Sequence, residues 1–276
     1  MLVTTEQGLA GATGRLAQLG MVPDQVLAPS DDRRLLLTAV GDQTEAARAV
    51  ARLRTEGWLA VLRPDGGVQL EAWRRHTAPI AIGGRLTVCY AWSEQDRHRL
   101  PNVLEFDPGG GFGTGGHPST RLLLEELAAR ITGGERVLDV GCGSGVLVLS
   151  ALLLGASTGV GVDIDVLAIE ATGRNAALNG LQRRMEATAR ELAEIEGAFD
   201  VVVANIGWAA LVDLAPQLAD RLSPRGWLAV SGISPTHESL VASRLRPLQV
   251  VGRRTSGEWH SLVLVHPPTG TNAIAL

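Results

Sequence analysis

The chain has 276 residues, of which 45% are hydrophobic, and its formal net charge is −4 at pH 7. This size is sufficient for one large domain with a smaller companion. The charge gives no electrostatic basis for binding nucleic acid or an anionic membrane surface. Two cysteines, Cys89 and Cys142, are too few for a disulfide framework or a metal-ligand cluster, so we expect no metal centre.

The hydropathy of the chain favours a cytoplasmic protein. The N-terminal sequence MLVTTEQGLAGATG lacks the basic and apolar regions of a secretion signal. No uninterrupted apolar run reaches the roughly 18 residues that a membrane-spanning helix needs. We therefore expect a protein that does not enter a membrane.

Residues 1–73 are predicted to form a small, mostly antiparallel α/β domain. A poor, glycine-interrupted helix is predicted between Glu6 and Leu19. After it the pattern indicates a strand, a helix and two further strands, an order βαββ. These four elements are expected at 35–40, 44–56, 58–63 and 68–73. Residues 74–79 are predicted to be a linker.

Residues 80–276 are predicted to form the larger domain. Its first segment, 79–90, is typical of a β-hairpin, and the six glycines between Leu104 and Thr120 predict a shaped loop rather than a helix or strand. From 137 onward apolar strands alternate with helices, including helices at 209–222 and 235–245 and a strand at 227–233. This alternation predicts a doubly wound parallel sheet, closed by a hairpin that makes the last strand antiparallel.

The central motif is VLDVGCGSG, residues 137–145, in which a buried strand enters a glycine turn and a helix follows. Glycine suits positions where φ is positive or where a ligand approaches the backbone closely. A turn of this kind at the carboxyl end of a parallel strand is where an α/β sheet holds a nucleotide-like ligand. The motif therefore predicts a cofactor site around Gly141, Gly143 and Gly145.

Two acidic residues accompany the glycine turn. Asp139 precedes it, and we interpret this carboxylate as an acceptor for backbone amides of the turn. Asp163 ends the next strand, where a carboxylate can accept both ribose hydroxyls of an adenosine. A nicotinamide dehydrogenase would carry the same acidic residue, but the glycine spacing here is GxGxG and not GxGxxG.

Several segments together resemble a known family. VLDVGCGSG, VGVDID and DVVVANI are similar to the class I S-adenosylmethionine-dependent methyltransferases. More closely, DPGGGFGTGGHPSTRLLLEEL, ANI, SGI and GEWHSLVL resemble the PrmA family of ribosomal protein methyltransferases, over roughly Pro79 to Val265. The resemblance implies a Rossmann-like seven-stranded sheet, S-adenosyl-L-methionine as cofactor, and a small N-terminal domain that helps to choose the substrate.

The resemblance also implies which residues form the site. The predicted cofactor-binding residues are Phe112, Thr114, Thr120, Gly141, Gly143, Asp163 and Asn205. We predict Asn205 and Ile206 to be catalytic, because the Asn205 side-chain oxygen and the Ile206 carbonyl could aim a neutral amine at the methyl group. Simpler alternatives are that Asn205 ends a strand and that Thr120 caps a helix.

The implied reaction is methyl transfer to amino groups of a ribosomal protein. The chain departs from the family where substrate is chosen: Gly116 replaces a threonine, NIGWAAL replaces NILAGPL, and the N-terminal region is shorter than the family's βαββαβ domain. Three alternatives therefore stay open. The acceptor could be another protein, a peptide or a small amine; the chain could bind the cofactor without turnover; or it could be the dehydrogenase.

Three further residues have both a plain and a functional interpretation. Trp208 is either an aromatic wall beside the substrate or an ordinary core residue. His117, before a proline at a helix start, is interpreted as a hydrogen-bonding organiser of its loop rather than an acid or base. Cys142 is interpreted as a small packing residue rather than a nucleophile.

Overall fold

The structure of the chain is a computed structural model. It describes residues 79–91, 100–107 and 116–268, and in the N-terminal part residues 2–5, 9–19, 21, 25–30, 33–37, 43–56 and 59–60. The chain divides into two compact units, Met1–His76 and Thr77–Leu276. The strand predicted at 68–73, the linker up to residue 78, Phe112 and Thr114 lie outside the described residues.

The N-terminal unit has more elements than the sequence predicted. Its strands pair antiparallel in the order β2-β3-β1-β4. The described residues follow the order βαββαβ. The predicted strand, helix and strand at 35–40, 44–56 and 58–63 are confirmed at Arg33–Leu37, Gln43–Thr55 and Leu59–Ala60. The prediction missed β1 and β2, whose short segments do not alternate between apolar and polar residues. The elements are β1 (Leu2–Thr5), α1 (Leu9–Gln18), β2 (Gln25–Ser30), β3 (Arg33–Leu37), α2 (Gln43–Thr55) and β4 (Leu59–Ala60).

A small apolar core holds this unit together. It combines buried residues of the sheet, such as Leu2 and Leu36, with Leu16 of α1 and Leu53 of α2. Arg15 of α1 also forms an ion pair with Glu56, which directly follows α2. The two helices are therefore tied to the sheet by apolar packing and to each other by charge.

A seven-stranded sheet forms the centre of the larger unit, in the order β10-β9-β8-β11-β12-β14-β13. β14 runs antiparallel to both of its neighbours, and the other neighbouring pairs are parallel. The predicted doubly wound sheet with a closing hairpin is confirmed. The strands are β8 (Arg136–Val140), β9 (Thr158–Val162), β10 (Met185–Thr188), β11 (Phe199–Asn205), β12 (Leu222–Ile233), β13 (Gln249–Ser256) and β14 (Trp259–Val265).

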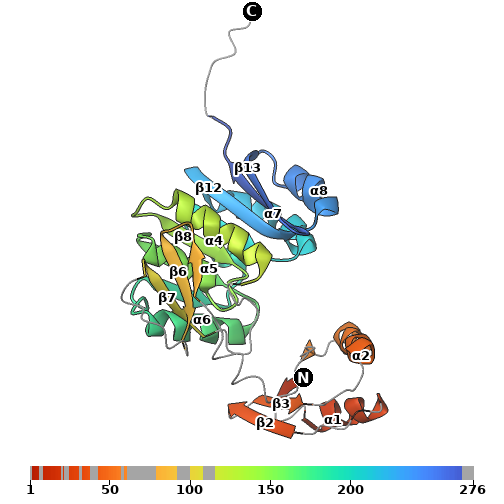
Figure 1. Cartoon of the computed structure of the whole chain (residues 1–276). Coiled ribbons are helices and arrows are strands. Elements are labelled where there is room, and N and C mark those ends of the chain that lie inside the picture. Colours follow the sequence, from red (N-terminus) through yellow and green to blue (C-terminus); the bar gives the residue numbers. More distant parts are fainter. Residues whose placement is uncertain are drawn as a thin grey trace, which may run out of the picture. The chain divides into compact units, whose positions relative to one another are not determined.

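Helices cover both faces of this sheet (Figure 1). In β11, Val201 and Val203 join the core that includes α4 and α5, whereas Val202 and Ala204 join the core that includes α7 and α8. This alternation follows from the two-residue period of a strand. The helices are α4 (Pro118–Arg130), α5 (Val146–Leu153), α6 (Val166–Leu178), α7 (Trp208–Asp220) and α8 (Glu238–Arg244).

Two element boundaries differ from the sequence prediction. The helix expected at 235–245 is a 3-10 turn, Pro235–His237, followed by α8. Strand β12 begins at Leu222, earlier than the predicted strand at 227–233. Across the described residues, no helix combines the length and the apolar character required to cross a membrane.

A second, three-stranded sheet contains β5 (Ile80–Ile82), β6 (Leu86–Tyr90) and β7 (Val103–Phe106). The antiparallel pair of β5 and β6 confirms the predicted hairpin. The loop predicted from Leu104 to Thr120 is wrong at its beginning, because β7 pairs there in parallel with β6. Residues 108–115 of this segment lie outside the described part of the chain.

On the side away from β6, the backbone of β7 and of Asp107 forms hydrogen bonds with two asparagine side chains. Asn175 lies in α6, and Asn179 directly follows it. The Glu105 amide donates to Asn179 Oδ1 at 2.8 Å, and Asn179 Nδ2 donates to the Glu105 carbonyl at 2.6 Å. Asn175 makes the same exchange with Asp107, both bonds at 3.0 Å. The side-chain amides of Asn175 and Asn179 lie one helical turn apart and take the place of a neighbouring strand. Because these partners are distant in the sequence, the local pattern did not predict β7.

We predict that Asn179→Ala destabilises the larger unit by about 1–3 kcal/mol, because the half-buried amide and carbonyl of Glu105 lose their partners. The free energy of unfolding in urea measures this change. Gln182→Ala, at an exposed position just beyond α6, is the control and should change it by less than about 0.5 kcal/mol. Equal effects of the two substitutions would contradict the pairing role of Asn179.

Candidate functional site

The glycine turn connects β8 to α5 as the sequence predicted. Gly141, Gly143 and Gly145 all adopt positive φ, at 73°, 56° and 82°. At Gly141 space is also restricted, because an ideal Cβ would lie 2.3 Å from Cγ2 of Ile206. Glycine is therefore required there by both backbone conformation and packing.

Asp163 directly follows β9 and faces the turn. Its Oδ2 accepts a hydrogen bond from the Gly143 amide at 2.9 Å, and its Oδ1 accepts one from the Asp165 amide at 3.0 Å. A carboxylate has about four lone-pair positions, so about two remain for a ligand such as a vicinal diol. The structure thus brings together two predicted cofactor-binding residues, Gly143 and Asp163.

Asp139 has a different partner from the one predicted. Its buried carboxylate accepts a hydrogen bond from the Val148 amide at 3.2 Å, in the first turn of α5. The expectation that it bonds amides of the glycine turn itself is wrong, because the side chain reaches the helix N-terminus beyond the turn. Its Oδ1 is buried and has no hydrogen-bond partner among the described residues.

This environment changes the protonation of Asp139. Burial raises its pKa to about 7; the hydrogen bond from Val148 opposes the rise, and the negative charge of Asp163 adds to it. A buried acceptor oxygen without a donor, beside a second carboxylate, favours a ligand that carries positive charge.

Asn205 and Thr120 meet at the carboxyl edge of the sheet. Asn205 ends β11, and its Nδ2 donates to the hydroxyl of Thr120 in α4 at 2.9 Å. Thr120 does not cap α4, because the His117 side chain accepts the Ser119 amide instead, as expected for a loop organiser. Because the hydrogen bond to Thr120 holds the side-chain nitrogen of Asn205, the side-chain oxygen Oδ1 is left to accept a hydrogen bond from a ligand.

Ile206 lies between two glycines. Its side chain packs against Gly141, and its carbonyl oxygen would lie 2.3 Å from an ideal Cβ at Gly232, where φ is 88°. The ends of β8, β11 and β12 therefore meet at Ile206. The sequence motif SGI contained Gly232 without revealing this contact.

Aromatic side chains lie beyond the same edge. The Trp208 indole stacks on the His237 ring with centroids 4.0 Å apart and planes 7° from parallel. Trp208 is 37% exposed, so the interpretation as an ordinary core residue is wrong. The sequence prediction missed His237, and also Ile164, which is fully exposed beside Asp163.

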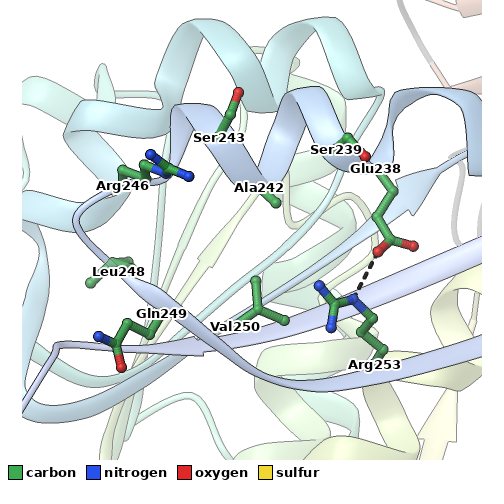
Figure 2. Close-up of a pocket in the computed structure, with 9 residues that line it drawn as sticks. All are labelled: Glu238, Ser239, Ala242, Ser243, Arg246, Leu248, Gln249, Val250 and Arg253. Atoms are coloured by element: carbon green, nitrogen blue, oxygen red, sulfur yellow. Dashed lines mark hydrogen bonds and ion pairs between the residues drawn. The ribbon is translucent and has the colours of Figure 1, made fainter.

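Two other features lie apart from this chemistry. Cys142 is buried, and this burial raises the pKa of its thiol, as expected for a packing residue rather than a nucleophile. A pocket of about 440 Å³ lies between α8 and β13, where Glu238 pairs with Arg253 at 2.8 Å (Figure 2). None of the residues lining this pocket belongs to the glycine turn or to the Asn205–Thr120 pair.

The strand order and the site define the class of the protein. A glycine turn at the point where the strand order reverses, a carboxylate on the neighbouring strand and an antiparallel strand inserted near the sheet edge are those of a Rossmann-like class I methyltransferase fold. The family model "Ribosomal protein L11 methyltransferase (PrmA)" matches residues 69–267. The chain therefore belongs to the PrmA family, whose cofactor is S-adenosylmethionine, and the nicotinamide alternative is not favoured.

Individual relatives agree with this assignment. A ribosomal protein L11 methyltransferase of Geobacter sp. (strain M21) is 42% identical over 71% of this chain and 66% of its own length. That of Geobacter metallireducens is 39% identical over 82% of this chain and 71% of its own. The chain thus matches only about two thirds of these relatives' length.

A solved structure gives the same fold. The ribosomal protein L11 methylase of Lactobacillus delbrueckii subsp. bulgaricus is 29% identical, with a TM-score of 0.64, and the match covers 69% of this chain and 99% of that one.

We predict that Asp139→Asn gains stability relative to the wild type as pH rises. The wild-type carboxyl has a pKa of about 7 in the folded state, against 3.8 for an ordinary aspartate. Its contribution to the free energy of unfolding is therefore full below pH 3.8 and is lost as pH rises through 7. Asparagine does not titrate. Chemical unfolding measures the free energy of unfolding of both proteins at pH 5 and at pH 8. From pH 5 to pH 8, the difference between them should shift by about 2–3 kcal/mol in favour of the variant. A difference independent of pH would contradict the raised pKa.

We predict that Gly232→Ala destabilises the protein by about 1–3 kcal/mol, because the new methyl group meets the Ile206 carbonyl and φ is unfavourable. Gly207→Ala is the matched control: it also adjoins Ile206, but a Cβ there has open space. Thermal unfolding of both variants provides the comparison. An unchanged midpoint for Gly232→Ala would show that the Ile206 backbone is not held in this position.

Proposed function

We propose that this chain transfers methyl groups from S-adenosylmethionine to amino groups of ribosomal protein L11. One observation carries the proposal: the hydrogen bond from Asn205 to Thr120 orients an acceptor oxygen at the strand end nearest the glycine turn. Membership of the PrmA family and the βαββαβ order of the N-terminal unit support the choice of a ribosomal protein.

The described residues fit the cofactor. Asp163 retains lone pairs for ribose hydroxyls, the glycine turn admits close approach of a ligand, and the orphaned oxygen of Asp139 favours a cation. The exposed Ile164 offers an apolar surface for the adenine ring of the cofactor. When bound, S-adenosylmethionine supplies an electrophilic methyl group on a positively charged sulfur.

The role of the protein in the reaction is positioning. The acceptor amine must be neutral to attack, and its N–H groups would donate to Asn205 Oδ1 and to the Ile206 carbonyl. These two bonds direct the nitrogen lone pair, and holding reactants in line can contribute several kcal/mol. The N–C bond forms as the C–S bond breaks, and the proton of the resulting ammonium leaves to water.

The proposed substrate places the protein with ribosomes in the cytoplasm. A soluble protein acceptor is consistent with the net charge of −4, which gives no general attraction to nucleic acid. Among the acceptors considered, a protein is favoured over a small amine because the family match extends over most of the larger unit.

We predict that Asn205→Ala lowers kcat for methylation of ribosomal protein L11 by about 10²-fold, because the amine loses one of two orienting acceptors. Transfer of a tritiated methyl group to the purified unmethylated ribosomal protein measures this. The chain contains arginine but no lysine. Labelled lysine therefore arises only in the acceptor.

Thr120 provides the matched controls. Thr120→Val removes the hydroxyl that holds the Asn205 amide and should lower kcat, whereas Thr120→Ser retains the hydroxyl and should restore most of it. Near-normal turnover by Asn205→Ala would overturn the proposed mechanism. Wild-type protein that binds the cofactor but labels no ribosomal protein would overturn the proposed substrate.

A further inference from the structure

The order of strands divides the site into two halves. The glycine turn and Asp163 follow β8 and β9, on one side of the point where the strand order reverses. On the other side, the register pairs Asn205 of β11 with Ser231 of β12, and Ser231 with Ser261 of β14. These three residues form a row across the strands beside the carboxyl end of β11, in which Ser231 and Ser261 are buried. With the cofactor on the first half, as proposed above, the acceptor reaches Asn205 over the second.

An aromatic pair lies just beyond this row. Trp208 begins α7, three residues after Asn205, and His237 lies in the connection from β12 to α8. The rings come from neighbouring strand ends and stack at 4.0 Å. Although Trp208 is the largest type of side chain, it remains 37% exposed. The stack therefore presents aromatic surface on the acceptor side of Asn205.

Hydrogen bonds fix this pair in place. His237 Nδ1 lies 2.7 Å from the Ser234 hydroxyl and 3.1 Å from that of Thr236. The next residue, Glu238, is held by an ion pair to Arg253 and by a hydrogen bond with His260 Nδ1. The His237 ring thus supports the Trp208 indole in one orientation before any ligand binds, and such preorganisation increases affinity.

We propose that the Trp208–His237 stack is the acceptor-binding wall of the site and takes an alkylammonium side chain of the lysine type; this rests on the proposed function. The π-face of an indole attracts an ammonium group, and its apolar surface packs against a methylene chain. The amine therefore collects at the wall as a cation and loses its proton before it attacks beside Asn205. A methylated ammonium is attracted by the same surface.

This wall belongs to the chain's own sequence. The segment NIGWAAL places Gly207 and Trp208 where the family pattern has leucine and alanine. Gly207 has open space around its Cα, so the turn from Ile206 into α7 is unobstructed.

The test compares Trp208→Ala, Trp208→Phe and the control Leu240→Ala, which truncates another exposed apolar side chain, on α8. We expect Trp208→Ala to raise KM for unmethylated ribosomal protein L11 by about tenfold, and Trp208→Phe to raise it less. The Kd for S-adenosylhomocysteine and the thermal midpoint should stay within the range of the Leu240→Ala control. An unchanged acceptor KM in Trp208→Ala would overturn the proposal.

A second measurement does not depend on turnover. Butylammonium chloride is titrated into protein loaded with S-adenosylhomocysteine while the Trp208 indole N–H is followed by NMR, with Trp208→Phe to assign the signal. We expect a saturable shift in the wild type that weakens severalfold in His237→Ala. The absence of a saturable shift would overturn the aromatic wall. A saturable shift without methylation of the ribosomal protein would overturn the proposed substrate and leave the wall intact.

Discussion

The arrangement of the site depends on the absence of side chains at two glycines that face Ile206. Ideal Cβ atoms at Gly141 and Gly232 would each lie 2.3 Å from an atom of Ile206. The ends of β8, β11 and β12 can therefore approach more closely than side chains would permit. This close packing fixes the distance between the glycine turn and Asn205. A methyl transfer that works by positioning requires such a fixed distance.

The hydrogen bond between Asn205 and Thr120 adds direction to this fixed distance. It joins β11 to α4, and it decides which end of the Asn205 amide faces a ligand. The orphaned oxygen of Asp139 and the two free positions on Asp163 lie on the opposite side of the switch point. In the proposed mechanism, the cationic cofactor and the neutral amine would therefore be bound by different chemistry on the two halves of one sheet edge.

The sequence predicted the features that depend on local pattern. The period of apolar residues predicted the sheet, and the glycine spacing predicted the turn with Asp163 beside it. Features that depend on distant residues were missed: β7 is paired by the side chains of Asn175 and Asn179, and Asp139 reaches Val148 beyond the turn. The stack of Trp208 on His237 was also missed, because no local pattern indicates which rings meet across strand ends.

The measurement that tests the account most directly is calorimetric titration of S-adenosylhomocysteine into the wild type and into Asp163→Asn. This substitution keeps one acceptor oxygen and replaces the other with an NH2 group, so one of the two backbone hydrogen bonds and the proposed ribose contacts weaken. Thermal unfolding of the variant checks that it is folded. We expect the wild type to bind and the variant to bind with an affinity at least about tenfold lower. A wild type that does not bind, or equal affinities, would contradict the cofactor site described for the glycine turn and Asp163.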